Sequence, residues 1–253
     1  MRIFIRRTSF FLALLQCTAL LSLAQDSALV KKAESLEQLG VYAFTEGDYE
    51  KALSHLEEAA KINARSARPY FWRGLSFQAL NQPLNAAMSF NRALDYDSTN
   101  YLIFYNLAKS YRALRMFNRA IESDSVAINL KPDFLLSRLD LGLLHLERKN
   151  YDAAISTLKE VIARKPQHAL AHFYIGQCYL AKGLKDSTEF FFAQSCVLDS
   201  TNYNSFLTLG TFYYQNHRYE EGISSFRQAG SIDPWSPEVF HKLGDGYSKR
   251  QEH

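Results

Sequence analysis

The chain has 253 residues, of which 47% are hydrophobic and 22% charged, and its formal net charge is +3. That size and apolar content allow a folded core, and the near-neutral charge excludes the strongly basic composition of nucleic-acid-binding proteins.

Residues 1–24 have the pattern of a secretory signal peptide. Arg2, Arg6 and Arg7 precede an apolar run of about 15 residues, which ends in small residues before Gln25. A transmembrane helix needs about 20 apolar residues, so an uncleaved anchor is the second interpretation. Cleavage removes three arginines and no acidic residue, which leaves 26 basic and 26 acidic residues. We expect an exported protein, periplasmic or extracellular, with no membrane insertion after cleavage. The sequence Leu-Ala-Gln at the cleavage site resembles exported proteins of bacteria with two membranes.

After a short segment at 25–32, small residues recur every 34 positions. The main series consists of Gly40, Gly74, Ala108, Gly142, Gly176, Gly210 and Gly244. A fixed period of this length is typical of repeat arrays. The six complete units are 33–66, 67–100, 101–134, 135–168, 169–202 and 203–236. Residues 237–253 repeat the first half of the unit, and we expect a capping helix there.

Each unit has the apolar spacing of two helices. In 203–236, the first stripe at i, i+3, i+4 and i+7 consists of Phe206, Leu209, Gly210 and Tyr213. After a polar break, the second stripe consists of Tyr219, Ile223, Phe226 and Gly230. We therefore predict two antiparallel helices per unit, whose small residues let the backbones approach while a large side chain fills the space beside them. That large residue occupies a column of Leu56, Phe90, Leu158, Phe192 and Phe226, with Asp124 as the exception.

These residues resemble the tetratricopeptide repeat family, and the resemblance covers 33–253. The family pattern is nearly complete in 203–236, at Phe206, Leu209, Gly210, Tyr213, Gly222, Phe226, Ala229 and Pro234. The resemblance implies an all-α fold, a right-handed α-solenoid of antiparallel helix pairs. It also implies that the first helix of each pair lines a concave groove.

The helical phase opposite the packing stripe gives the candidate peptide-binding residues of that groove. They are Phe71, Trp72, Leu75, Tyr105, Asn106, Lys109, Arg112, Leu139, Leu143, Phe173, Tyr174, Gln177, Leu207 and Tyr214. The same phase in 33–66 gives Glu37, Gln38, Val41 and Phe44. Aromatic and leucine side chains interrupted by amides and cations suit an extended or helical peptide. Two other interpretations are that neighbouring repeats cover this face, or that the protein self-associates through it.

Two charged residues interrupt the packing pattern. Asp124 and Arg138 each replace an apolar or aromatic residue, and a lone buried carboxylate is costly. One hypothesis pairs them across the boundary between 101–134 and 135–168; the other places both side-chain tips in solvent. Some family members hold a C-terminal carboxylate with lysine, asparagine and arginine. Here Asn106 and Lys109 would be followed by Leu136 and Asp140, so that clamp is not expected.

The sequence offers no catalytic or metal-binding motif. His168 and His172 alone have a spacing of four residues that suits two metal ligands, and we expect a solvated helix start there instead. Cys178 and Cys196 fall about two helical turns out of register, which favours two buried free thiols over a disulfide. We expect no enzyme activity, no cofactor and no metal.

The predicted function is that of a non-catalytic scaffold or adaptor in the cell envelope. Its groove would hold a peptide or segment of another protein. The alternative is the extracytoplasmic sensory or regulatory input module of a signalling protein. No nucleic acid is expected among its partners.

Overall fold

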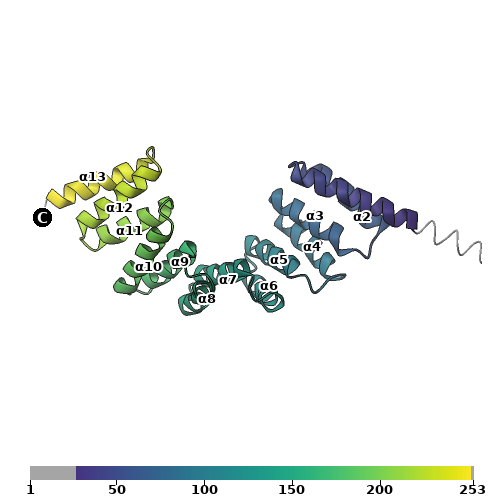
Figure 1. The fold of residues 1–253 in the computed structure, drawn as a ribbon, viewed down its shortest axis with the longest axis horizontal. Coiled ribbons are helices and arrows are strands. Elements are labelled where there is room, and N and C mark those ends of the chain that lie inside the picture. The colour runs from purple at the N-terminus through teal and green to yellow at the C-terminus, as the bar shows by residue number, and fades with distance from the viewer. Residues whose placement is uncertain (1–26, 252–253) are drawn as a thin grey trace, which may run out of the picture. The chain divides into compact units, whose positions relative to one another are not determined.

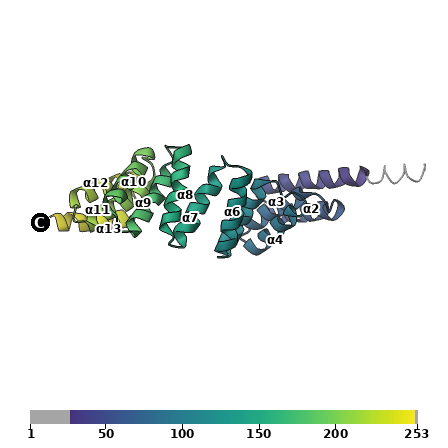
Figure 2. The ribbon, with the colours of Figure 1, turned by 90° about the horizontal axis from the view of Figure 1, so that it is seen from below.

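The computed structural model describes residues 27–251, and the predicted leader, residues 1–24, lies outside this range. Within it every regular element is an α-helix, and successive helices are joined by short turns (Figure 1; Figure 2). The same residues include no helix with both the length and the apolar character needed to span a membrane. The predicted all-α architecture of helix pairs is confirmed.

The chain divides into two compact units, the first ending at Leu130 and the second beginning at Lys131. The first unit contains a helix over residues 27–45, then α2 (Tyr49–Ile62), α3 (Ala67–Ala79), α4 (Pro83–Leu94), α5 (Tyr101–Ala113) and α6 (Phe117–Leu130). The second contains α7 (Leu135–Glu147), α8 (Tyr151–Arg164), α9 (Ala169–Ala181), α10 (Lys185–Leu198), α11 (Tyr203–Gln215), α12 (Tyr219–Ile232) and α13 (Pro237–Gln251). In each repeat the first and second helices pack on one another.

The close approach within a helix pair depends on the glycine of the 34-residue series. A Cβ atom built on Gly74 would lie 2.4 Å from the Phe90 ring, and one on Gly176 would lie 2.5 Å from Phe192. Both rings are fully buried. The glycine is therefore required because the large residue of the second helix occupies the space that any side chain would need.

Ala108 and Asp124 belong to the same pair of positions in the repeat 101–134. The two residues are 1% exposed each, and they stand where other repeats have glycine facing leucine or phenylalanine. The aspartate side chain is smaller than either, so it leaves volume for the alanine methyl group. The two departures from the pattern therefore compensate each other, because the smaller side chain at position 124 makes room for the larger one at position 108.

Each first helix of the six complete repeats ends in the same left-handed turn. The residues with positive φ are Gly47, Asn81, Arg115, Lys149, Gly183 and His217. In the second repeat the Asn81 N–H donates to the Gln78 carbonyl (3.0 Å) and the Gln82 N–H to the Phe77 carbonyl (2.8 Å). This is the Schellman arrangement, which satisfies the last carbonyl groups of a helix. The turn ends the first helix at the same register position in each of these repeats.

Several first helices begin at a side-chain cap. Asn100 accepts a hydrogen bond from the Leu102 backbone at 3.0 Å, and Asn202 accepts one from Ser205 at 3.1 Å. Asparagine is among the strongest N-cap residues because its oxygen meets a backbone donor that the helix leaves unpaired. These caps and the Schellman turns together fix where each helix starts and ends.

The C-terminal half-repeat forms α13, which packs on α12. Val239 and Gly246 are its buried residues; His241, Lys249 and Arg250 are exposed, and Lys242 and Asp245 are half-buried. Phe240 is also 63% exposed, and Trp235, in the preceding turn, is 88% exposed. The outer side of this helix is therefore polar with aromatic interruptions.

Candidate functional site

The candidate surface of the first unit lies on α3 and α5, the first helices of two successive repeats. The side-chain amide of Gln78 on α3 donates to the Asn106 carbonyl (2.8 Å) and to the Ser110 hydroxyl (2.9 Å) on α5. These bonds join the two helices directly. The exposed sides of α3 and α5 therefore form one continuous surface, which we call the first-helix surface.

Aromatic rings occupy much of this surface in the first unit. Phe71, Trp72, Leu75 and Tyr105 are all half-buried. The Trp72 ring lies 5.4 Å from Phe44 and 5.9 Å from Phe71, close enough to fix its orientation by edge-to-face packing. The aromatic cluster is therefore ordered before any partner binds.

Polar residues on the same surface are placed differently from one another. Lys109 is exposed, and its ammonium lies 5.5 Å from the centre of the Tyr105 ring. Arg112 is half-buried. Asn106 is only 8% exposed, and its amide donates to the Leu102 carbonyl at 2.8 Å. The prediction that Asn106 projects outward is wrong, because its side chain is used to bond its own helix.

In the second unit the corresponding residues lie on α7, α9 and α11, and we call the exposed sides of these helices the first-helix surface of that unit. The half-buried ones are Leu143, Tyr174, Gln177, Leu207 and Tyr214. Leu139 and Phe173 are buried, at 7% and 8% exposure, and the prediction that they project outward is wrong. Leu139 packs in a core with Ile175, while Phe173 packs against Phe192 and Leu209. In both cases the adjacent helices cover the predicted position.

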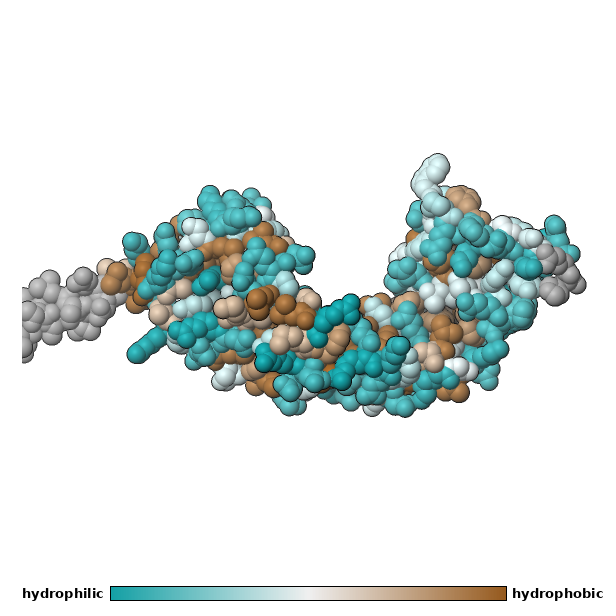
Figure 3. All heavy atoms as spheres, turned by 180° about the vertical axis from the view of Figure 1, so that it is seen from behind, coloured by the Kyte–Doolittle hydropathy of each residue, from teal (hydrophilic) through white to brown (hydrophobic). Residues whose placement is uncertain are grey.

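In each unit this surface includes both apolar and polar side chains, such as Tyr105 and Lys109 on α5 and Tyr174 and Gln177 on α9. On the face of the molecule that Figure 3 presents, hydrophobic and hydrophilic residues are interspersed.

Glu37, predicted on the same face in the first repeat, is 9% exposed and pairs with Arg68 at 2.7 Å. Burial raises the pKa of this carboxyl group, and the Arg68 charge partly opposes that rise. The residue therefore joins the first repeat to α3 and is not open to a ligand. Gln38, by contrast, is exposed.

The side chains of Asp124 and Arg138 are both buried, so the interpretation that their tips reach solvent is wrong. Arg138 donates from Nε to Glu160 (3.0 Å) and from a terminal nitrogen to the Pro132 carbonyl (2.6 Å). Its charge is thus used within the second unit. The proposed pairing of Arg138 with Asp124 stays a prediction, because the two residues belong to different units.

The two histidines at helical spacing have structural roles. His168 is the N-cap of α9, and its Nδ1 accepts a hydrogen bond from the Ala171 backbone at 3.3 Å. His172 is 7% exposed and lies 5.9 Å from the Phe191 ring, so it is not the solvated residue that we predicted. Among the described residues no three histidine, cysteine or acidic side chains come together as metal ligands. Cys178 and Cys196 are buried free thiols, as predicted.

The sequence analysis missed a hollow on the other side of α3, between this helix and α4. Two arginines line it. The signal was present in the repeat register, since Arg73 precedes Gly74 at a place where the other repeats have leucine or isoleucine. This position lies outside the glycine series and the column of large residues that define the repeat.

Comparison with known proteins decides the family. The tetratricopeptide repeat profile matches residues 37–101, 100–163 and 139–187, more than half of the chain. The chain belongs to the tetratricopeptide repeat family. Proteins of this family are protein-interaction scaffolds and are generally not catalysts.

Two curated relatives of this tetratricopeptide repeat protein are longer than it is. DnaJ homolog subfamily C member 3 of Gallus gallus is 34% identical over 95 residues, which are 38% of this chain and 19% of that protein. BBSome complex member bbs-4 of Caenorhabditis elegans is 19% identical over 246 residues, which are 94% of this chain and 53% of that protein. The chain thus spans about half or less of the length of these relatives.

Solved structures of similar length share the fold. PilW, described as a widely conserved type IV pilus biogenesis factor, has a TM-score of 0.71 at 18% identity, covering 83% of this chain and 98% of its own. YrrB, described as a TPR protein with an unusual peptide-binding site, has a TM-score of 0.58 at 20% identity, covering 74% and 96%. At these identities the likeness concerns the fold alone.

Proposed function

We propose that this tetratricopeptide repeat protein is a non-catalytic scaffold that holds a peptide or protein segment on its first-helix surface. The observation that carries the proposal is that, in each unit, aromatic and leucine side chains of the first helices are half-buried, packed against the cores on one side and accessible on the other. A half-buried ring has a fixed orientation and still offers apolar area to a partner. Such side chains commonly supply most of the energy of binding.

The binding mode follows from the polar groups beside those rings. Lys109 lies beside Tyr105 in the first unit, and Gln177 lies on α9 with Tyr174 in the second unit; each can bond the backbone or carboxylate groups of a bound segment. The fold likeness to YrrB supports peptide capture, because that protein is described as having a peptide-binding site. The proposal also places the protein in the cell envelope, after cleavage of the leader before Gln25.

The test uses two matched double variants of the second unit in the full chain. The first, Tyr174→Ala with Tyr214→Ala, removes two half-buried rings from the first-helix surface. The control, Phe190→Ala with Val197→Ala, removes two apolar side chains that are 56% and 76% exposed on the second helix α10. Tyr174 packs against the cores that contain Ile175 and Phe173, so circular dichroism melts verify that both variants are folded. Phe173 is excluded from the test because its removal would damage the core.

Each variant is used to capture partners from envelope extract, with identification by mass spectrometry. We expect a partner that is retained by wild type and by the Phe190/Val197 control and lost by the Tyr174/Tyr214 variant. Equal capture by both variants would reject the first-helix surface. If instead the wild-type protein forms a concentration-dependent dimer that only the Tyr174/Tyr214 variant loses, this surface serves self-association. Cell fractionation with N-terminal sequencing tests the location, since the proposal requires a mature chain beginning at Gln25.

A further inference from the structure

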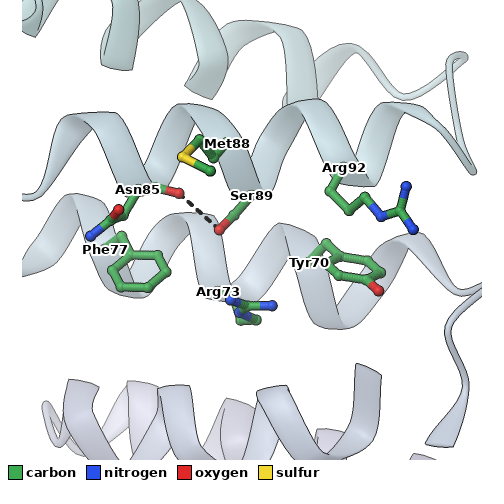
Figure 4. Close-up of a pocket in the computed structure, with 7 residues that line it drawn as sticks. All are labelled: Tyr70, Arg73, Phe77, Asn85, Met88, Ser89 and Arg92. Carbon is green, nitrogen blue, oxygen red and sulfur yellow. Dashed lines mark hydrogen bonds between the residues drawn. The ribbon is translucent and has the colours of Figure 1, made fainter. Parts of the chain in front are cut away.

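A hollow of about 290 Å³ opens between α3 and α4 in the first unit. The residues that matter for its chemistry are Tyr70, Arg73 and Phe77 on α3, with Met88, Ser89 and Arg92 on α4. Figure 4 shows Tyr70 and Arg92 at one end and Phe77 at the other, with Arg73, Ser89 and Met88 between them. The residues of this hollow are separate from those of the first-helix surface.

Comparison with another repeat of the same chain explains why the space is open. In the repeat 169–202, Phe191 occupies the register position of Ser89, and its ring stacks 5.4 Å from Tyr179. Tyr179 in turn corresponds to Phe77 in the hollow. The small Ser89 side chain, which donates to the Asn85 carbonyl at 2.9 Å, therefore leaves unfilled a volume that a phenyl ring fills three repeats later.

Arg73 is the second departure from the repeat pattern. The residue before the series glycine or alanine is aliphatic in every other repeat, namely Leu39, Leu107, Leu141, Ile175, Leu209 and Leu243. The Nε atom of Arg73 is buried and has no hydrogen-bond partner in the described part of the chain. A buried charged donor without an acceptor is destabilising. Because this atom is inaccessible to solvent, a ligand in the hollow would meet the Arg73 guanidinium group through its other nitrogens.

A second guanidinium group lies at the end of the hollow. The Arg92 and Arg73 groups are each 5.9 Å from the centre of the Tyr70 ring. Arg92 also lies 5.3 Å from Tyr96, which stacks on Tyr70. The stacked Tyr70 and Tyr96 rings thus stabilise the positively charged guanidinium groups beside the partly apolar lining of the hollow.

Two carboxylates with exposed side chains, Glu57 and Asp95, interact with these arginines. The Glu57 pKa is lowered mainly by Lys61 and also by the charge of Arg73. Glu57 on α2 is engaged by Lys61 at 3.1 Å, and Asp95 pairs with Arg92 at 2.9 Å. Both pairs are largely exposed to solvent. Exposed ion pairs contribute little free energy, so Arg92 can exchange Asp95 for a ligand at small cost.

We propose that this hollow binds a carboxylate group of a partner polypeptide, with an apolar side chain next to it. Arg73 and Arg92 receive the carboxylate, because the planar guanidinium group presents several donors to its two oxygens. Phe77 and Met88 receive the apolar side chain; Met88 is 63% exposed and Leu84, one turn earlier on α4, is 60% exposed. The site goes beyond the proposed function, since it uses other residues and names the chemistry of the ligand.

The experiment measures binding of labelled synthetic peptides to the full chain by fluorescence anisotropy. One peptide carries an internal glutamate–phenylalanine pair and an amidated C-terminus. A second ends in phenylalanine with a free carboxylate, and a third has glutamine in place of glutamate with an amidated end. The first two distinguish a side-chain carboxylate from a C-terminal one, and the third removes the charge at constant shape.

Three variants test the hollow with little risk to the fold. Arg73→Leu restores the residue type of the other repeats, Ser89→Phe fills the space as Phe191 does, and Arg92→Gln removes the second charge. Arg65→Gln, which removes an exposed arginine elsewhere in the first unit, is the control. Circular dichroism melts verify that each variant is folded.

We expect wild type and the Arg65 control to bind at least one carboxylate peptide about tenfold or more tightly than the glutamine peptide. The Arg73→Leu and Ser89→Phe variants lose that preference, and Arg92→Gln weakens it. The inference is overturned if wild type shows no preference for a carboxylate, or if Arg73→Leu and Ser89→Phe bind as wild type does. Complete competition by inorganic phosphate at lower concentration than by acetate would overturn the carboxylate assignment. None of these outcomes depends on Tyr174 or Tyr214, so this site and the first-helix surface are tested separately.

Discussion

Replacing Gly176 with alanine tests the packing rule on which the repeat depends. The added Cβ would lie 2.5 Å from the Phe192 ring, about 0.9 Å short of the 3.4 Å at which ordinary contact begins. Phe192 is fully buried, so the ring cannot swing into solvent. Gly244, in the same register of α13, is the matched control, since nothing lies within 4 Å of a Cβ built there.

The expected changes in the free energy of unfolding have opposite signs at the two sites. Replacing glycine with alanine within a helix stabilises the folded state by about 1 kcal/mol through helix propensity. Overpacking of a dense core costs about 1–3 kcal/mol, and the full burial of Phe192 favours the upper part of that range. We therefore expect Gly176→Ala to destabilise by about 1–2 kcal/mol and Gly244→Ala to stabilise by about 0.5–1 kcal/mol. Because the propensity gain is common to both, their difference isolates the contact with Phe192.

The assay is urea unfolding followed by far-ultraviolet circular dichroism. Repeat arrays can unfold in parts, so hydrogen exchange is measured alongside to locate the change. Faster exchange should appear in α9 and α10 for Gly176→Ala, and slower exchange in α13 for Gly244→Ala. The reasoning is refuted if Gly176→Ala raises the unfolding midpoint as much as Gly244→Ala does.

Three further changes follow from contacts described above. Asp124→Leu should destabilise the protein by about 1–3 kcal/mol through overpacking against Ala108. Adding Ala108→Gly should recover about 1 kcal/mol or more. If the unfolding free energies of the two changes are additive in a double-mutant cycle, the two side chains do not compensate each other in volume. Burial raises the pKa of Cys178 to about 11 and that of Cys196 to about 12. Both thiols should therefore resist a thiol reagent at pH 8 until urea unfolds the chain. Stoichiometric labelling of the native protein would disprove this. Burial, followed by a nearby lysine charge, lowers the pKa of His168, so its stabilising contribution is present above the unfolded value of about 6.5 and is lost as the pH falls below it. The variant His168→Asn keeps a capping oxygen without titrating, so its urea midpoint should fall less than that of wild type between about pH 7 and pH 5, and equal losses would argue against the cap.

The fold could be predicted from the sequence because its determinants are local and repeated. The series containing Gly74 and the column containing Phe90 lie 16 residues apart in each repeat, which indicates one helix packed on the next. The exposure of single side chains was harder to predict. Phe173 and Leu139 lie on the predicted face but are covered by neighbouring helices, and helical phase alone does not say how far a neighbour reaches.

Two features could have been found by comparing columns pairwise. Ala108 and Asp124 appear as separate exceptions in the sequence, and only their contact position in the helix pair makes them one exchange of volume. The departures of Ser89 and Arg73 from the repeat pattern were likewise visible in the sequence. Predicting an open hollow would also require knowing that no other side chain fills the space beside them. The identity of the partner could not be predicted from the sequence. A binding surface selects the chemistry of its residues but does not make them recur at a fixed spacing along the chain.

The constant length of the first helices limits how this protein can change in size. The helices α3, α5, α7, α9 and α11 each have 13 residues, and each ends in the same left-handed turn. One residue inserted into such a helix would rotate everything after it by about 100°, which turns core residues toward water. Deletions and duplications are therefore expected to be tolerated in whole multiples of the repeat, so that the array grows or shrinks in discrete steps while each remaining helix keeps its length.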